Sequence, residues 1–153
     1  MISMKIIDFF DDEYAFLSNF YPSPIVIYGV YYPTVEHYFQ SEKTIDEEEK
    51  FNIIHANSPN LAKGFGRHCT LCPNWENIKD SVMLRGVQEK FRQNKDLKEK
   101  LLNTGDAILI EGNTWHDNYW GNCTCFQCRN IEGKNQLGKT LMYIRQELKG
   151  GDV

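Results

Sequence analysis

Apolar residues along this chain recur mostly at helical spacing, three or four positions apart. The longest such segment is residues 74–94, whose apolar side chains wrap more than half of the predicted helix, so we expect this helix to be central. A second long stripe runs along residues 135–150. Shorter helical patterns occupy four further segments: residues 34–43, 46–56, 57–67 and 95–105.

Patterns typical of strands are fewer and shorter. Residues 4–10 and 107–112 each predict a strand, and residues 24–33 predict a hairpin whose two arms flank Gly29. Helices and strands mix without a regular alternation. The sequence therefore predicts the α+β class: a single compact domain over residues 1–153, mostly helical with a small sheet.

Two helix starts carry their own local signals. Thr34 and Ser58 are residue types that cap helices, and Pro59 suits the first helical position. We expect Gly64 or Gly66 to end the helix that Ser58 begins, because glycine favours the conformation that terminates helices.

Charge and hydropathy narrow the classes of function. The formal net charge of the 153 residues is −4, which argues against broad binding to nucleic acid, because such binding needs a surplus of Lys and Arg. No apolar run is long enough to cross a membrane, and residues 1–16 lack the apolar core of a signal peptide. We therefore expect a cytoplasmic protein.

The predicted helix 34–43 carries polar groups beside its apolar stripe. Glu36, Gln40 and Lys43 fall within about 60° of one another on a helix, on a face adjoining the expected core. One interpretation is a solvated face with a spaced ion pair. The other is that Glu36, partly desolvated, has a raised pKa and exchanges protons with a substrate. His37 points elsewhere and is expected to be structural.

The segment "NTWHDNYWG", residues 113–121, gathers aromatic and polar side chains in a predicted loop. The aromatic rings either cap an edge of the core or form the walls of a site for a flat ligand. Asp117 accordingly either makes a local turn or supplies a charge to the reacting bond.

Lys63 and Arg67 lie around the glycine-containing end of the predicted helix 57–67. Together these two side chains suit a phosphate, which the planar guanidinium of Arg binds in a bidentate manner. The alternative is ordinary pairing of basic residues with a helix C-terminus.

The five cysteines are spaced as two groups, Cys69-x2-Cys72 and Cys123-x-Cys125-x2-Cys128. Two C-x2-C pairs supply four thiolates, so the sequence predicts a structural zinc site at Cys69, Cys72, Cys125 and Cys128. Unligated thiols are the alternative. No histidine belongs to this set, which argues against a catalytic zinc ion.

Several motifs occur together in a fixed order. They are "FLSNFYP", "YPTVEHYFQSEK", "SPNLAKGFGR", "NWENIKDSVM", "LLNTGDAILIEG", "WHDNYWG" and "GKNQLGKTLMYIR". From about residue 7 to residue 148 the chain resembles the YbiA-like family, also called the NADAR domain. The joint occurrence of "VEHYFQ", "NWE" and "DNYWG" is much more specific than any one of them.

The resemblance implies an enzyme that hydrolyses N-glycosidic bonds to ribose. The expected activity is cleavage of the ribosyl C1 to nitrogen bond of phosphoribosylamino pyrimidines, intermediates of riboflavin synthesis, with release of ribose 5-phosphate. Two alternatives remain: an ADP-ribosyl hydrolase that removes ADP-ribose from guanine, and a non-catalytic module that binds NAD or ADP-ribose. No catalytic metal and no required cofactor are implied.

The resemblance also implies roles for individual residues. Glu36 and Asp117 are the expected pair of catalytic carboxylates, and Lys43 is a candidate for Schiff-base capture of an opened sugar. The expected substrate-binding residues are Trp75 and Trp120 for stacking, Asn19 and Gln40 for hydrogen bonds, and Lys63 and Arg67 for phosphate. The cysteine-rich segment before "GKNQLG" departs from the shorter glycine-rich turn of simple family members.

Overall fold

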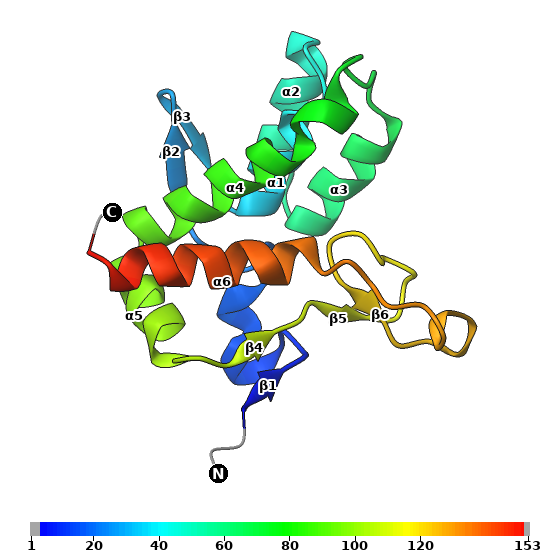
Figure 1. Ribbon diagram of the computed structural model, residues 1–153. Helices are drawn as coiled ribbons and strands as arrows, with labels where there is room; N and C mark the ends of the chain where they lie inside the picture. The colour runs from blue at the N-terminus through cyan, green and yellow to red at the C-terminus, as the bar shows by residue number, and fades with distance from the viewer. Residues whose placement is uncertain (1–3, 152–153) are drawn as a thin grey trace. The chain divides into compact units, whose positions relative to one another are not determined.

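The structure, a computed structural model, describes residues 4–151, in which helices predominate and six short strands pair two by two (Figure 1). The chain divides into two compact units. One unit consists of residues 19–95, and the other combines residues 1–18 with residues 96–153. Each unit is described by itself.

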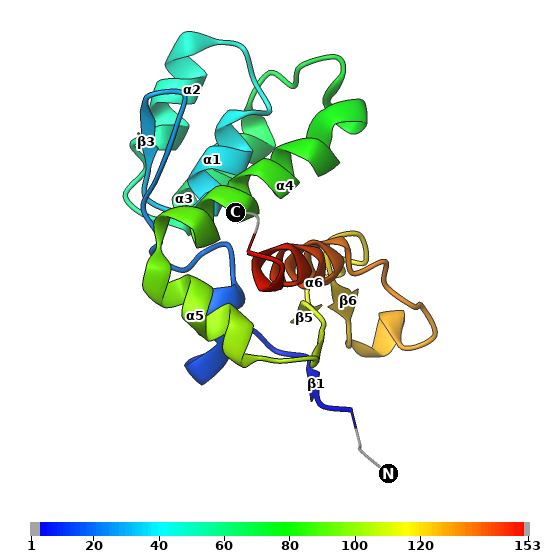
Figure 2. The same cartoon turned by 60° about the vertical axis from the view of Figure 1, so that its left-hand side comes forward.

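The unit of residues 19–95 consists of a hairpin followed by four helices (Figure 2). Its elements are β2 (Ile25–Ile27), β3 (Val30–Tyr32), α1 (Val35–Ser41), α2 (Glu47–Ile54), α3 (Pro59–His68) and α4 (Trp75–Gln93). The two strands pair antiparallel, and both Tyr28 and Gly29 have a positive φ in the turn between them. The predicted hairpin around Gly29 is therefore confirmed.

The predicted helix starts are confirmed, whereas one predicted helix end is wrong. The side chain of Thr34 accepts a hydrogen bond from the backbone N–H of His37, and Ser58 caps α3 with Pro59 at its start. However, α3 continues through Gly64 and Gly66 to His68. Gly66 is needed for packing there, because a Cβ atom at this position would overlap the side chain of Gln40.

Helix α1 is buried along its whole length. Gly66 brings α3 close to one side of α1, and Gly86 of α4 does the same on another side. A Cβ atom at Gly86 would lie 2.8 Å from the ring of Tyr38 and 3.2 Å from Val35, both on α1. The two glycines thus let neighbouring helices approach α1 closely enough to cover its polar residues.

The other unit centres on α6 (Gln136–Lys149) and a short parallel strand pair. Its remaining elements are β1 (Ile6–Ile7), a 3-10 helix (Asp12–Leu17), α5 (Lys95–Asn103), β4 (Ile108–Leu109), β5 (Gly112–Asn113), β6 (Asn122–Cys123) and a second 3-10 helix (Phe126–Cys128). Strand β1 pairs with β4, and β5 pairs with β6. Arg145 of α6 donates to Thr104 and to the carbonyl of Ala107, which ties α6 to the turn before β4.

The α+β class is confirmed, with helices predominating. The strands of residues 4–151 form three separate two-stranded pairs, so the predicted small sheet is divided. Within the same residues, no helix is both long and apolar enough to span a membrane.

Replacing Gly86 by Ala tests the packing of α4 against α1. The added methyl group has no room beside the rigid ring of Tyr38, so Gly86→Ala is expected to lower the free energy of unfolding by about 1–3 kcal/mol, typical of overpacked cores. Urea denaturation followed by circular dichroism measures this change.

Gly64→Ala is the matched control, because a Cβ atom at Gly64 meets nothing within 4 Å. This change is expected to be neutral or to stabilise the protein by up to about 1 kcal/mol, since alanine favours helix more than glycine. Equal effects of the two substitutions would contradict the close packing at Gly86.

Candidate functional site

The carboxylate of Glu36 is buried and held by Gln40. Glu36 is 7% exposed and Gln40 is 3% exposed, and Gln40 Nε2 donates to Glu36 Oε1 over 2.8 Å. Gln40 Oε1 is also buried, and it accepts no hydrogen bond from any residue that the structure describes. The interpretation of this face as a solvated surface is wrong, because Glu36 and Gln40 are buried and α3 packs against Gln40 at Gly66. A buried carboxylate next to an incompletely paired amide is typical of a functional position.

Asn19 fixes the beginning of α1. Its backbone carbonyl accepts a hydrogen bond from Glu36 N over 3.1 Å, and its side-chain Nδ2 lies 3.3 Å from Met83 Sδ. The side chain is itself buried. Asn19 therefore positions the turn that carries Glu36, and its expected contact with substrate stays a prediction.

Lys43, just beyond the C-terminus of α1, lies in a cluster of charged side chains. Burial lowers the pKa of Lys43, and the nearby carboxylate of Glu36 partly opposes this effect. The positive charges of Lys63 and Arg67 lower the same pKa further. The structure thus brings together four of the predicted site residues, with the charges of Glu36, Lys63 and Arg67 all near Lys43.

The two cations of α3 lie one helical turn apart. Lys63 Nζ is 5.8 Å from the ring centre of Phe20, and Lys43 Nζ is 5.8 Å from that of Phe39. Arg67 is exposed. Aromatic rings therefore accompany two of the three cations, and the guanidinium of Arg67 is accessible to a ligand.

Trp75 is a core residue at the start of α4. It is 6% exposed and packs edge-on against Phe39, with ring centres 5.1 Å apart. Its contact with Phe39 links α4 to α1 beside the site. Stacking of Trp75 on a substrate ring stays a prediction.

His37 has the structural environment that the sequence predicted. Its Nδ1 lies 2.8 Å from Thr34 Oγ1, and its Nε2 lies 3.0 Å from the carbonyl of Ala56. Because the carbonyl accepts from Nε2, Nδ1 accepts from the Thr34 hydroxyl and the ring is neutral. Burial lowers the pKa of His37, which agrees with this form.

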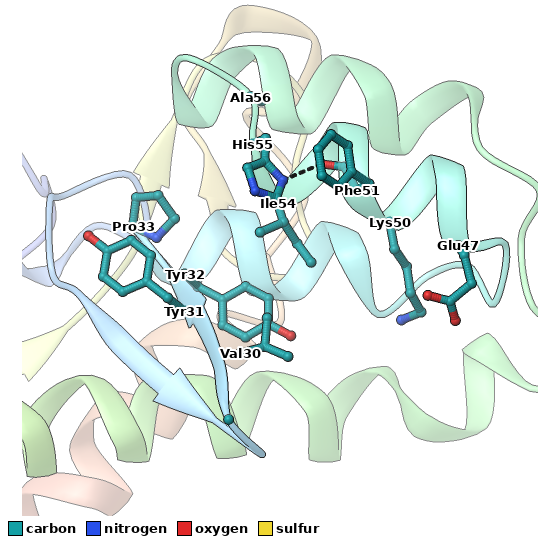
Figure 3. Close-up of a pocket in the computed structure, with 11 residues that line it drawn as sticks. Val30, Tyr31, Tyr32, Pro33, Glu47, Lys50, Phe51, Ile54, His55 and Ala56 are labelled. Carbon is teal, nitrogen blue, oxygen red and sulfur yellow. Dashed lines mark hydrogen bonds between the residues drawn. The ribbon is translucent and has the colours of Figure 1, made fainter.

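A cavity of about 710 Å³ lies elsewhere in the same unit, between the β2–β3 hairpin and α2 (Figure 3). Tyr31 and Tyr32 line it from the hairpin, and Phe51 stacks on His55 opposite them. None of the predicted site residues lines this cavity. Its walls also include Glu47 and Lys50, a carboxylate and an amine.

Asp117 and Trp120 belong to the other unit. Asp117 Oδ1 accepts hydrogen bonds from the backbone N–H groups of Tyr119 and Trp120, over 3.1 and 2.9 Å. Asp117 therefore makes the local turn that was one of its two interpretations. Trp120 is half-buried and packs edge-on against Tyr119. The pairing of Asp117 with Glu36, and stacking on Trp120, stay predictions.

Asn113 is a residue of this loop that the sequence did not single out. It is 4% exposed, its Oδ1 accepts from the backbone N–H groups of Trp115 and Asp117, and its Nδ2 donates to the carbonyl of Asp117. Asn113 therefore holds the backbone of Asp117 in place. Its position at the start of "NTWHDNYWG", among residues that favour turns, was the available signal.

The predicted ligand set for zinc is corrected by the structure. Among residues 4–151, the Cys and His side chains that lie close enough to hold a metal ion are His116, Cys123, Cys125 and Cys128. Cys69 and Cys72 are not members, and they belong to the unit of residues 19–95. The sequence interpretation counted only C-x2-C pairs. It therefore missed His116, which precedes Cys123 by seven residues in the same loop.

Comparison with known proteins relates this chain to one family and to named enzymes. The NADAR domain family matches residues 8–149. The N-glycosidase YbiA of Escherichia coli is 40% identical over 147 residues, which cover 94% of this chain and 88% of the relative. An N-glycosidase of Nostoc punctiforme is 39% identical over 141 residues, covering 89% of this chain and 86% of the relative.

Two further matches extend the comparison. A riboflavin biosynthesis protein of Vibrio vulnificus is 35% identical over 141 residues, which cover 91% of this chain but 37% of that longer protein. Among solved structures, the NMR structure of Escherichia coli YbiA matches with a TM-score of 0.84 and 37% identity, over 99% of this chain and 89% of that chain.

Proposed function

This chain belongs to the NADAR family and is an N-glycosidase, and on this premise we propose that it hydrolyses phosphoribosylamino pyrimidines and releases ribose 5-phosphate. The observation that carries the proposal is the charge cluster around Lys43, which includes the buried carboxylate of Glu36. Lys63 and Arg67 add positive charge near Lys43, which suits a phosphorylated sugar. Relatives named as riboflavin biosynthesis proteins of Vibrio vulnificus and Zea mays support this substrate class.

The reaction breaks the bond between C1 of ribose and the exocyclic nitrogen of the pyrimidine. Positive charge develops on C1 and the ring oxygen as the bond lengthens, and a carboxylate beside C1 stabilises it. Glu36 takes this role in the proposal and removes a proton from the attacking water. The water oxygen bonds to C1, and the departing nitrogen gains a proton from a general acid.

Neighbouring residues prepare Glu36 for this role. Gln40 holds one carboxylate oxygen by its amide, so the carboxylate has a fixed orientation before substrate binds. Lys63 and Arg67 hold the 5-phosphate in the proposal, since their charges lie on successive turns of α3. Asp117 is proposed as the second carboxylate and Trp120 as a stacking surface.

The expected location of the enzyme is the cytoplasm, and its hydrolytic reaction is expected to need no cofactor.

A turnover panel tests the substrate class. The enzyme is expected to release ribose 5-phosphate from a phosphoribosylamino pyrimidine faster than it removes ADP-ribose from guanosine, in line with its relatives that are named as riboflavin biosynthesis proteins. Chromatographic detection of the released sugar measures both rates. Turnover of the ADP-ribosylated guanosine alone would replace the proposed substrate with its alternative.

Variants in the same assay test the phosphate site. Arg67→Ala is expected to raise KM about tenfold or more for the phosphorylated substrate and to leave the dephosphorylated riboside unaffected. Arg92→Ala is the matched control, since Arg92 pairs with Glu89 on the surface of α4. Equal changes with both ribosides would contradict phosphate binding by Arg67.

Lys43 offers a separate route through the opened sugar, whose C1 is then an imine to the pyrimidine nitrogen. The amine of Lys43 attacks this C1, the pyrimidine amine leaves, and the resulting Schiff base between Lys43 and the sugar is hydrolysed by water. Because burial lowers the pKa of Lys43, a larger fraction of this amine is neutral near pH 8 than for an exposed lysine. Borohydride treatment during turnover is therefore expected to trap a sugar adduct on Lys43, which peptide mass spectrometry locates.

Lys50→Arg and Lys43→Arg variants control this experiment. The adduct is expected to survive in Lys50→Arg, whose lysine pairs with Glu42, and to disappear in Lys43→Arg. An active enzyme that yields no adduct under these conditions excludes the Schiff base and leaves Lys43 as a binding cation.

A further inference from the structure

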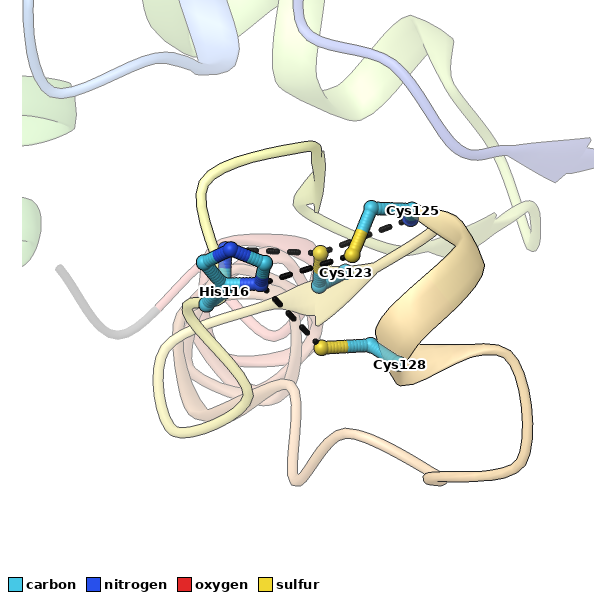
Figure 4. A group of neighbouring side chains, drawn as sticks. All are labelled: His116, Cys123, Cys125 and Cys128. Carbon is cyan, nitrogen blue, oxygen red and sulfur yellow. Dashed lines mark hydrogen bonds between the residues drawn. The ribbon is translucent and has the colours of Figure 1, made fainter.

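We propose that His116, Cys123, Cys125 and Cys128 bind one structural zinc ion. One atom of each side chain, the imidazole nitrogen or the thiol sulfur, lies within 4.8 Å of the others (Figure 4). His116 lies in the loop between β5 and β6, Cys123 ends β6, and Cys128 ends the second 3-10 helix, with Cys125 between them. Three sulfurs and one imidazole nitrogen are the ligand set that zinc prefers in structural sites.

The distances between these atoms fit a tetrahedral ion. His116 Nδ1 lies 3.4 Å from both Cys125 Sγ and Cys128 Sγ. A tetrahedral ion with zinc–sulfur bonds of about 2.3 Å and a zinc–nitrogen bond of about 2.0 Å places such atoms roughly 3.5 Å apart. These two nitrogen–sulfur distances therefore lie near the spacing that zinc requires, and all four ligand atoms lie within 4.8 Å of one another. All four corners are protein atoms, so the site is closed and structural.

Backbone groups also favour a thiolate at this position. The backbone N–H groups of His116 and Cys125 point to Cys123 Sγ, over 3.3 and 3.5 Å. Cys123 and Cys128 are 2% and 6% exposed, so their sulfurs are shielded from solvent. Backbone N–H bonds to sulfur, in a shielded site, stabilise metal-bound thiolates and orient them.

Apolar packing contributes little to the order of this loop. Its large apolar side chains lie outward, with Trp115, Phe126 and Ile131 exposed by 57%, 76% and 51%. The strand pair β5–β6 contributes only two residues on each side. Local hydrogen bonds hold the loop, and a bound metal ion would add a link between His116 and the cysteines that follow β5.

The zinc ion would also order the segment that contains Asp117. His116 directly precedes Asp117, and Thr124, between two of the cysteines, bonds through its backbone N–H to the carbonyl of Asn113. Asn113 in turn holds the backbone of Asp117. The metal therefore closes the loop in which Asp117 forms its turn, and this role is independent of whether Asp117 acts in catalysis.

Metal analysis of the full-length protein tests the proposal directly. Protein expressed with added zinc and purified under reducing conditions is expected to contain about one zinc per chain. X-ray absorption spectroscopy is expected to find three sulfur neighbours at about 2.3 Å and one nitrogen neighbour at about 2.0 Å. Less than about 0.2 zinc per chain, or a shell of four sulfurs, would overturn it.

Variants assign the ligands. Cys125→Ser together with Cys128→Ser is expected to remove the zinc, whereas Cys69→Ser, a cysteine outside the cluster, is expected to retain it. Zinc retained by the double variant, or lost from Cys69→Ser, contradicts the assignment. If the double variant does not fold, titration of metal-free wild-type protein with Co²⁺ tests the site instead. An absorption spectrum typical of Co²⁺ bound tetrahedrally by thiolates supports the site, and the absence of this spectrum rejects it.

Discussion

The close packing of α1 between α3 and α4 is the constraint on which the candidate site depends. Gly66 and Gly86 remove the side chains that would keep these helices apart. Gly66 lets α3 pack against Gln40, and Gly86 lets α4 pack against the apolar side of α1. Glu36 and Gln40 thus lie on a helix that is buried along its whole length. A buried carboxylate interacts strongly with nearby charges because solvent does not screen it. The same packing therefore creates both the stability of the helix group and the electrostatic character of the site.

The charge distribution connects this packing with N-glycoside hydrolysis. A carboxylate held by an amide is suited to stabilise positive charge at C1 of ribose, while cations on α3 and beyond α1 suit a phosphate. The second unit contributes a loop of different construction. There hydrogen bonds from Asn113 hold the backbone around Asp117, and the proposed metal ion at the Cys and His cluster would add to this order.

Local features of the fold were predictable from sequence, and long-range contacts were not. Thr34 and Ser58 cap helices through bonds to residues three positions away, and Gly29 permits the turn of its own hairpin, so each signal is local. The packing of Gln40, which holds Glu36, involves Gly66, which lies 26 positions further along the chain than Gln40. Helical periodicity cannot detect such partners. His116 could not be predicted as a metal ligand for the same reason, since only the folded loop brings its ring to the cysteines.

The role of Glu36 is the central claim, and substitution by Gln tests it most directly. Gln keeps the size of the side chain and its hydrogen bonding, but it neither carries the charge nor accepts the proton. Glu36→Gln is expected to lower kcat by at least about a hundredfold while substrate affinity, measured by calorimetry, stays within about tenfold. Unchanged kcat, or a loss of affinity as large as the loss of turnover, would contradict a catalytic role for the buried carboxylate.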